Sequence, residues 1–223
     1  MNLKNKIGMV LHRSGVSADL LTVLGTLLAF FAGAAIYYGY FFQGAVLILF
    51  SGGLDLLDGA TARASGRPGY FGGIFDSSLD RYADAFIFGG VLFFCASTGR
   101  ALYAVLAFSA LLGAFSVSYV RARAECELED CRVGFWERGE RLVFLALGFL
   151  TRNPGFVLWV LALGPHFTAL SRLFYASQAR QETGKTTGRI ARYLAQNTGR
   201  GTTRYALKLL ALALFLMFWR IPF

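Results

Sequence analysis

Long apolar stretches separated by short polar turns dominate the first 180 residues of the chain. Residues 20–54 contain no charged side chain. Because a membrane-spanning helix needs about 20 predominantly apolar residues, this stretch holds one span and part of a second. Continued along the chain, the pattern predicts spans at about residues 20–42, 44–65, 73–97, 101–122, 141–151 extended at either end, and 154–178. We therefore predict an all-α integral membrane protein with six transmembrane helices.

The two ends of the chain differ from this apolar part. The first 15 residues predict an amphipathic helix lying on the membrane surface, with its apolar face formed by Leu3, Ile7, Val10 and Leu11. Residues 181–204 are polar and rich in Gly and Thr, which is typical of a linker. Residues 205–223 are apolar but short for a span, so they form either an interfacial helix or a seventh crossing. This predicts a membrane domain over 1–180, a cytoplasmic linker and an apolar C-terminal segment.

Composition and charge support a membrane location. Hydrophobic residues make up 56% of the chain and charged residues 16%, whereas a soluble domain has about 25% charged residues. The net charge of +9 indicates anchoring at anionic lipid and no nucleic-acid partner. The turns on one side hold Arg100 and Arg152, while the opposite side is far more basic. We therefore expect a multi-pass protein of the cell membrane with its N-terminus and active site facing the cytoplasm.

Five acidic residues lie within the second and third predicted spans: Asp55, Asp58, Asp76, Asp80 and Asp84. Carboxylates inside a bilayer are costly and usually mark an ion, proton or substrate site. The spacings i,i+3 and i,i+4 place each of the first two pairs on one helix face. Four converging carboxylates would repel one another, and a divalent cation with oxygen ligands, Mg²⁺ or Mn²⁺, would neutralise them. The alternative is a divalent-cation or proton transporter, which would catalyse no reaction.

The residues between the two pairs favour an enzyme over that transporter. Gly59 allows a bulky group to approach the helix, and Ala62 keeps the same face clear. Arg63 offers a forked donor for phosphate, and Gly72 thins the start of the facing helix. These residues predict a cleft for a phosphorylated ligand beside a pair of metal ions.

The run from Asp55 to Asp80 resembles the motif of the CDP-alcohol phosphotransferase family, D-x2-D-G-x2-A-R-x8-G-x3-D-x3-D, at every fixed position. The resemblance covers about residues 3–180. It implies transfer of a phosphatidyl-type group from a CDP-linked lipid to a hydroxyl, with release of CMP. It also implies a homodimer and two divalent cations.

The resemblance also implies a role for each motif residue. Asp55 and Asp76 would bridge the two metals, Asp58 would complete the first site, and Asp80 would complete the second and act as general base. The CDP-lipid would contact Gly59, Ala62, Arg63 and Gly72, under a 64–71 loop that includes Gly69.

A weaker element, Pro-Asn/Asp-x-x-Thr, resembles residues 18–22, with Ala18 in place of proline. It implies that Asp19 and Thr22 help to bind the CDP end of the lipid. A helix N-cap at Asp19 is an alternative that is compatible with this role.

The acceptor is indicated by three further stretches, YVRARAE, ERGER and TALSR. They resemble elements of phosphatidylinositol-phosphate synthases and their archaeal relatives, with Arg121 where lysine is usual and Gly139 where proline is usual. The resemblance implies a phosphate pocket for inositol 1-phosphate, formed by Ser118, Arg121, Arg138 and Arg172. Glycerol 3-phosphate or another polar alcohol is an alternative acceptor. Anchoring and ion pairs with nearby glutamates are the alternative role for these arginines.

Overall fold

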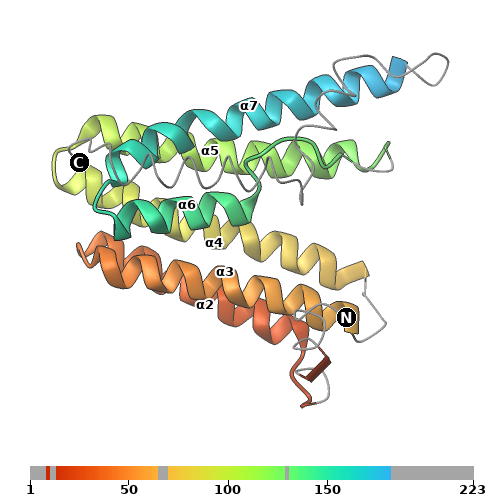
Figure 1. Cartoon of the computed structure of the whole chain (residues 1–223), viewed down its shortest axis with the longest axis horizontal. Helices are drawn as coiled ribbons and strands as arrows, with labels where there is room; N and C mark the ends of the chain where they lie inside the picture. Colours follow the sequence, from red (N-terminus) through yellow and green to blue (C-terminus); the bar gives the residue numbers. More distant parts are fainter. Residues whose placement is uncertain (1–8, 11–13, 65–69, 129–130, 182–223) are drawn as a thin grey trace. The chain divides into compact units, whose positions relative to one another are not determined.

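The computed structural model describes residues 9–10, 14–64, 70–128 and 131–181, and all regular secondary structure within them is helical (Figure 1). The helices are α2 (Ala18–Tyr37), α3 (Phe41–Ala64), α4 (Tyr70–Ser97), α5 (Ala101–Ala124), α6 (Arg138–Leu150) and α7 (Pro154–Gln181). The all-α class is confirmed. Most of the expected N-terminal surface helix, and the predicted linker and C-terminal segment from residue 182 on, lie outside the described residues.

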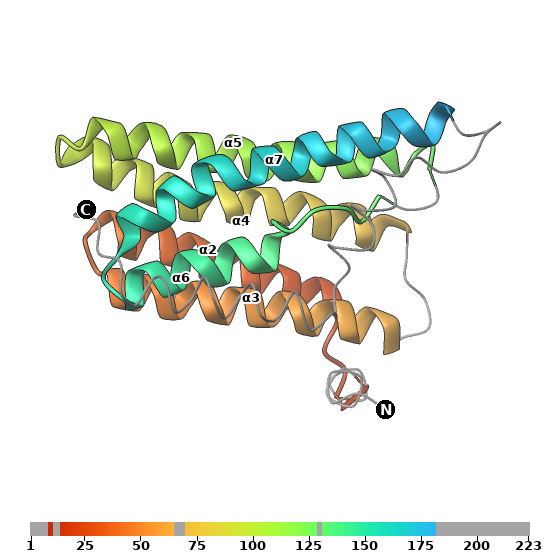
Figure 2. The same cartoon turned by 45° about the horizontal axis from the view of Figure 1, so that its top comes forward.

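The chain divides into two compact units, unit 1 over Met1–Arg100 and unit 2 over Ala101–Phe223. In unit 1, α2 packs against both α3 and α4. In unit 2, α7 packs against both α5 and α6, and Figure 2 shows α5 and α7 side by side along much of their length. Each unit is therefore organised around one helix that contacts its two neighbours. The single membrane domain expected over residues 1–180 stays a prediction.

Four of these helices are long and apolar enough to cross a membrane: α2, α3, α5 and residues Pro154–Ser177 of α7. The protein is accordingly a multi-pass membrane protein. Every 18-residue window of α4 includes at least three charged side chains. Helix α6 has 13 residues, which is roughly 20 Å of helix against a hydrocarbon core of about 30 Å. The expected total of six spans therefore depends on α4 and α6.

The turn after α2 lies earlier than the hydrophobic pattern predicts. The predicted span runs to residue 42, but α2 ends at Tyr37 because Gly39 adopts the left-handed conformation, with φ +82°. The N–H of Tyr40 then donates to the carbonyl of Ala35 at 2.8 Å, which closes the helix. The same bond follows two other helices. After α4, the backbone N–H of Arg100 donates to the carbonyl of Cys95, and after α6, that of Asn153 donates to the carbonyl of Gly148, each at 2.8 Å.

Two glycines bring α2 and α4 into backbone contact. A Cβ at Gly33 would collide with the carbonyl oxygen of Phe86, and a Cβ at Gly90 would collide with the carbonyl oxygen of Gly33. Small residues permit close helix approach in membranes, where packing between helices replaces the hydrophobic effect as the driving force. This crossing sets the separation of α2 and α4, and so the position of the acidic half of α4 within unit 1.

We expect Gly90→Ala to destabilise the protein by about 1–3 kcal/mol, the usual cost of overpacking, because the added methyl meets the α2 backbone. The matched control is Gly89→Ala, since a Cβ at Gly89 meets no atom of the described residues within 4 Å. Apparent Tm in detergent should fall for the first variant and stay at or above wild type for the second. Equal values for the two variants would contradict the close crossing.

Candidate active site

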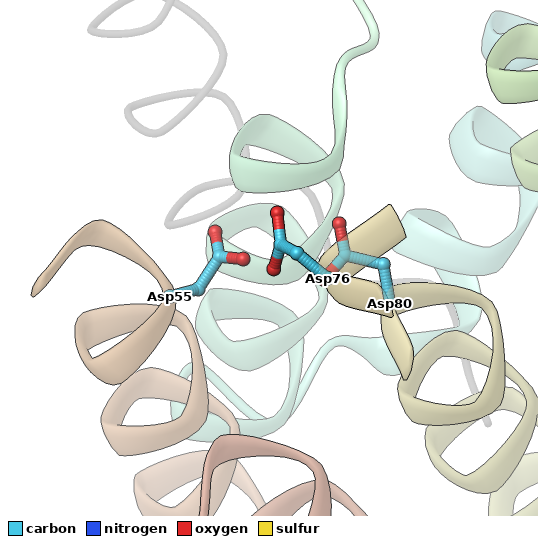
Figure 3. A group of neighbouring side chains, drawn as sticks. All are labelled: Asp55, Asp76 and Asp80. Atoms are coloured by element: carbon cyan, nitrogen blue, oxygen red, sulfur yellow. The ribbon is translucent and has the colours of Figure 1, made fainter. Parts of the chain in front are cut away.

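Three carboxylates of unit 1 come together at one point. Asp55 comes from α3, and Asp76 and Asp80 lie one turn apart on α4; Figure 3 shows the three side chains next to one another. One oxygen from each lies within 4.8 Å of the other two, and all three residues are partly buried. We call Asp55, Asp76 and Asp80 the acidic cluster.

The acidic cluster suits a hard divalent cation. Carboxylate oxygens are the ligands that Mg²⁺ and Mn²⁺ prefer. Three negative charges at this separation, in helices with few other charges, repel one another strongly unless a cation offsets them. The donor set and its spacing therefore fit the metal site expected from the motif.

Asp58, the fourth expected ligand, is placed differently. It is 4% exposed, and its Oδ2 accepts a hydrogen bond of 2.9 Å from the hydroxyl of Thr22 on α2. Asp55 and Asp76 are near enough for their charges to act on it. The structure thus brings three of the four aspartates into one group and ties the fourth to α2.

The residues expected to bind the CDP-lipid also belong to unit 1. The side chain of Arg63 folds back along its own helix, so that a Cβ at Gly59 would lie 3.4 Å from its Nη1. A Cβ at Gly72 would lie 3.9 Å from Oδ1 of Asp19, which places the starts of α2 and α4 close together. Ala62 is partly buried on α3, and Gly69 lies outside the described residues.

The first turn of α2 corrects one expectation. The N-cap is Ser17, whose hydroxyl accepts from the N–H of Leu20 at 3.2 Å. Asp19 is therefore not the cap but an exposed residue of the first turn. The helix dipole favours the carboxylate of Asp19 at this position, and the exposed side chain is accessible to a ligand.

Arg172 of α7 is almost completely buried in unit 2, at 1% exposed. Its Nε donates to the carbonyl of Val133 and its Nη1 to that of Val117, both at 2.8 Å. Its Nη2 donates to Oε1 of Glu137 at 3.2 Å. Arg172 therefore joins α5, α7 and the segment that leads into α6.

Arg121 and Glu137 extend this network. Nε of Arg121 lies 2.8 Å from Oε1 of Glu125, and its Nη1 lies 3.8 Å from Oε1 of Glu137. Glu137 thus lies between two of the arginines expected to bind the acceptor. Ser118 and Arg138, the other two expected residues, are partly buried in the same unit.

Two buried charged residues were not assigned a role from the sequence. Asp84, one turn beyond Asp80 on α4, is 3% exposed. Arg141 is 1% exposed, and its Nη1 donates to the carbonyl of Trp136 at 3.1 Å. Glu137 was foreseen only as an ion-pair partner. The available signal in each case was a charged residue within or beside an apolar helix.

Helices apolar enough to span a membrane, together with an acidic cluster that fits a divalent cation, point to the class of membrane-embedded enzymes that bind a metal ion. The CDP-alcohol phosphatidyltransferase family model matches residues 16–170, and the chain belongs to that family. This confirms the resemblance carried by the aspartate motif, and it favours a transferase over a transporter.

Relatives are similar over most of their length. The archaetidylinositol phosphate synthase of Methanothermobacter thermautotrophicus is 37% identical over 79% of this chain and 91% of its own. The phosphatidylinositol phosphate synthase of Streptomyces avermitilis is 36% identical over 86% of this chain and 82% of its own.

Solved structures give the same picture. The phosphatidylinositol phosphate synthase of Mycobacterium tuberculosis with CDP-DAG bound has a TM-score of 0.70 at 29% identity, covering 78% of this chain and 93% of that one. The same enzyme in complex with manganese and citrate also has a TM-score of 0.70 and covers 78% of this chain and 89% of that one.

We expect Asp55→Asn to weaken Mn²⁺ binding at least about 100-fold, because loss of a ligand should exceed the 10–100-fold cost of losing an outer partner. Asp84→Asn is the matched control, since Asp84 is a buried carboxylate outside the acidic cluster. Isothermal titration of the purified protein with Mn²⁺ measures both affinities. Equal losses for the two variants would mean that the acidic cluster is not the metal site.

Proposed function

We propose that this transferase moves a phosphatidyl-type group from a CDP-linked lipid to a hydroxyl of inositol 1-phosphate and releases CMP. The observation that carries the proposal is the acidic cluster, three carboxylates within 4.8 Å of one another, at the fixed positions of the family motif. The named activity of the archaeal and bacterial relatives supports inositol phosphate as the acceptor class.

Asp55, Asp58, Asp76 and Asp80 would hold two divalent cations, Mg²⁺ or Mn²⁺. When bound, such a pair stabilises the attacking and leaving oxygens of an in-line displacement. Asp80 accepts the proton of the acceptor hydroxyl as that oxygen forms its bond to the lipid-side phosphorus. The bond from this phosphorus to the CMP oxygen breaks, and CMP leaves with the electron pair.

The nucleotide half of the site would be formed by the starts of α2 and α4 and the end of α3. Arg63 would donate two parallel hydrogen bonds to the phosphates. Gly59 and Ala62 lie beside it, and a bulky side chain at either position would obstruct the phosphates. Gly72 would border the nucleotide as well, and Gly69, outside the described residues, is expected to contact it from the motif alone. Asp19, exposed in the first turn of α2, would accept hydrogen bonds from it.

The acceptor phosphate would be bound by Ser118, Arg121, Arg138 and Arg172 of unit 2. Arg172 is 1% exposed and all three of its nitrogens are bonded within the protein, so it would bind the acceptor phosphate by exchanging its contact with Glu137. Arg121 would exchange its contact with Glu125 or Glu137 for the phosphate. The acceptor phosphate would therefore replace a glutamate carboxylate as the anionic partner of these arginines.

The proposal includes the setting of the enzyme. The more basic turns would face the cytoplasm, so that CMP is released there and the product stays in the cell membrane. The protein would work as a homodimer with six spans per protomer.

The direct test is release of CMP by purified protein given a CDP-lipid, either diacylglycerol- or archaeol-linked, and one acceptor at a time. We expect inositol 1-phosphate to be used and kcat/KM for free inositol to be lower by a factor of about 10⁴–10⁵. With free inositol, the polar groups that would bind the phosphate are left without a partner. Use of glycerol 3-phosphate alone would contradict the acceptor assignment but not the transferase chemistry. No CMP release with any phosphorylated acceptor and metal would contradict the proposal itself.

The acceptor arginines have a separate test. Arg121→Ala should raise the KM for inositol 1-phosphate by at least about tenfold, the loss of roughly one charge-assisted hydrogen bond, while binding of CDP-lipid stays near wild type. Arg123→Ala is the matched control, because Arg123 is two residues further on the same helix and pairs with Glu127 at the surface. Arg138→Ala should behave like Arg121→Ala. Wild-type kinetics for both would remove the proposed phosphate pocket.

A further inference from the structure

The hydrogen bond from Thr22 to Asp58 joins two helices across 36 positions of sequence. Thr22 is 7% exposed and Asp58 is 4% exposed, so water competes little for either group. A hydroxyl that donates to a carboxylate forms one of the stronger hydrogen bonds in proteins. In this buried setting, the bond fixes the direction of the Asp58 side chain.

The Thr22 hydroxyl has a second acceptor within reach. Its Oγ1 lies 3.1 Å from the carbonyl oxygen of Ala18, one turn earlier, and 2.9 Å from Oδ2 of Asp58. A hydroxyl has one proton, and the charged, nearer acceptor takes it more strongly. Both acceptors lie within reach of the same Oγ1 position, so either bond keeps the side chain in the rotamer that faces Asp58.

Contacts one turn further along hold α2 and α3 at this separation. The hydroxyl of Ser51 donates to the carbonyl of Gly25 at 2.8 Å in a buried position. A Cβ at Gly25 would lie 3.5 Å from the carbonyl oxygen of Ser51 and 3.6 Å from Cβ of Leu54. The two helices therefore cannot drift apart near Thr22 without breaking a second buried hydrogen bond.

Asp58 needs such a tether because its neighbours are negatively charged. Asp55 and Asp76 repel it, and a side chain without a fixed partner would turn away from them. The bond from Thr22 to Oδ2 holds the carboxylate in one orientation, and in that orientation it would bind a cation. Hydrogen bonds of this kind orient ligating carboxylates in metal sites generally.

We propose that Thr22 is a positioning residue for the metal site, which holds Asp58 in its ligating orientation from α2. This inference rests on the proposed function, since it requires that Asp58 bind a cation. It differs from the role expected from the sequence, in which Thr22 contacts the CDP end of the lipid. Helix α2 is then part of the metal site although it supplies none of the four aspartates.

The test is Mn²⁺ binding to the full-length protein without nucleotide, measured by isothermal titration and by the electron paramagnetic resonance spectrum of the bound ion. Thr22→Val removes the hydroxyl and should weaken binding about 10–100-fold, the usual effect of losing an outer partner. Thr22→Ser keeps the hydroxyl and should stay within about threefold of wild type on the same scale. Thr26→Val is the matched control, because the Thr26 hydroxyl donates to the carbonyl of Thr22 within the same helix, and its affinity should be that of wild type.

The outcomes are distinct. Thr22→Val with wild-type Mn²⁺ affinity, or with weaker CDP binding only, overturns the inference and leaves the proposed function standing. Equal losses for Thr22→Val and Thr26→Val overturn it as well, because they indicate general damage to α2. Absence of Mn²⁺ binding by the wild-type protein overturns both the inference and the metal-dependent function.

Discussion

Repulsion between carboxylates is the constraint on which unit 1 depends. Aspartates brought this close in apolar helices are costly both to bury and to bring together. The helices must therefore hold them in place by packing that is independent of the charges. Helix α2 meets this requirement, since it contacts α3 and α4 at once and crosses α4 at Gly33 and Gly90 with backbone touching backbone. The stability of the site comes from this contact, and its reactivity comes from the charges that the contact keeps together.

Unit 2 contains buried positive charge, in contrast to the carboxylates of unit 1. Arg172 is 1% exposed, and its guanidinium pairs with one glutamate and donates to two backbone carbonyls. A buried ion pair of this kind contributes little net stability, but removing one partner is strongly destabilising because it leaves the other charge uncompensated. Glu137 shares its carboxylate between Arg172 and Arg121. The two units thus carry opposite charges: Arg172 of unit 2 is paired within its own unit, whereas the acidic cluster of unit 1 needs a cation to offset its charge.

Much of the site and of the fold could be predicted from the sequence, because both depend on local spacing. Charge-free stretches of about 20 residues define the spans, and i,i+3 and i,i+4 pairs define which carboxylates share a helix face. Prediction failed where tertiary contacts decide. The i,i+3 spacing places Asp58 on the face of Asp55, but it gives no sign that Oδ2 of Asp58 accepts a hydrogen bond from Thr22 on α2. Backbone carbonyls also leave no trace in a sequence, so the partners of Arg172 could not be named. The early end of α2 was missed because Gly39 stands among aromatic residues that continue the apolar pattern.

The bonds of Arg172 have a consequence for how the protein is made. Its carbonyl partners belong to residues 117 and 133, which leave the ribosome well before α7. Chains fold from the N-terminus as they are synthesised, so the bonds of Arg172 to these carbonyls form only after the last helix of the described residues has been made. Unit 1 can complete its helix contacts from its own residues, whereas the segment before α6 reaches its final conformation late. A ribosome stalled before codon 172 would therefore hold unit 1 with its helix contacts complete and unit 2 without the bonds of Arg172.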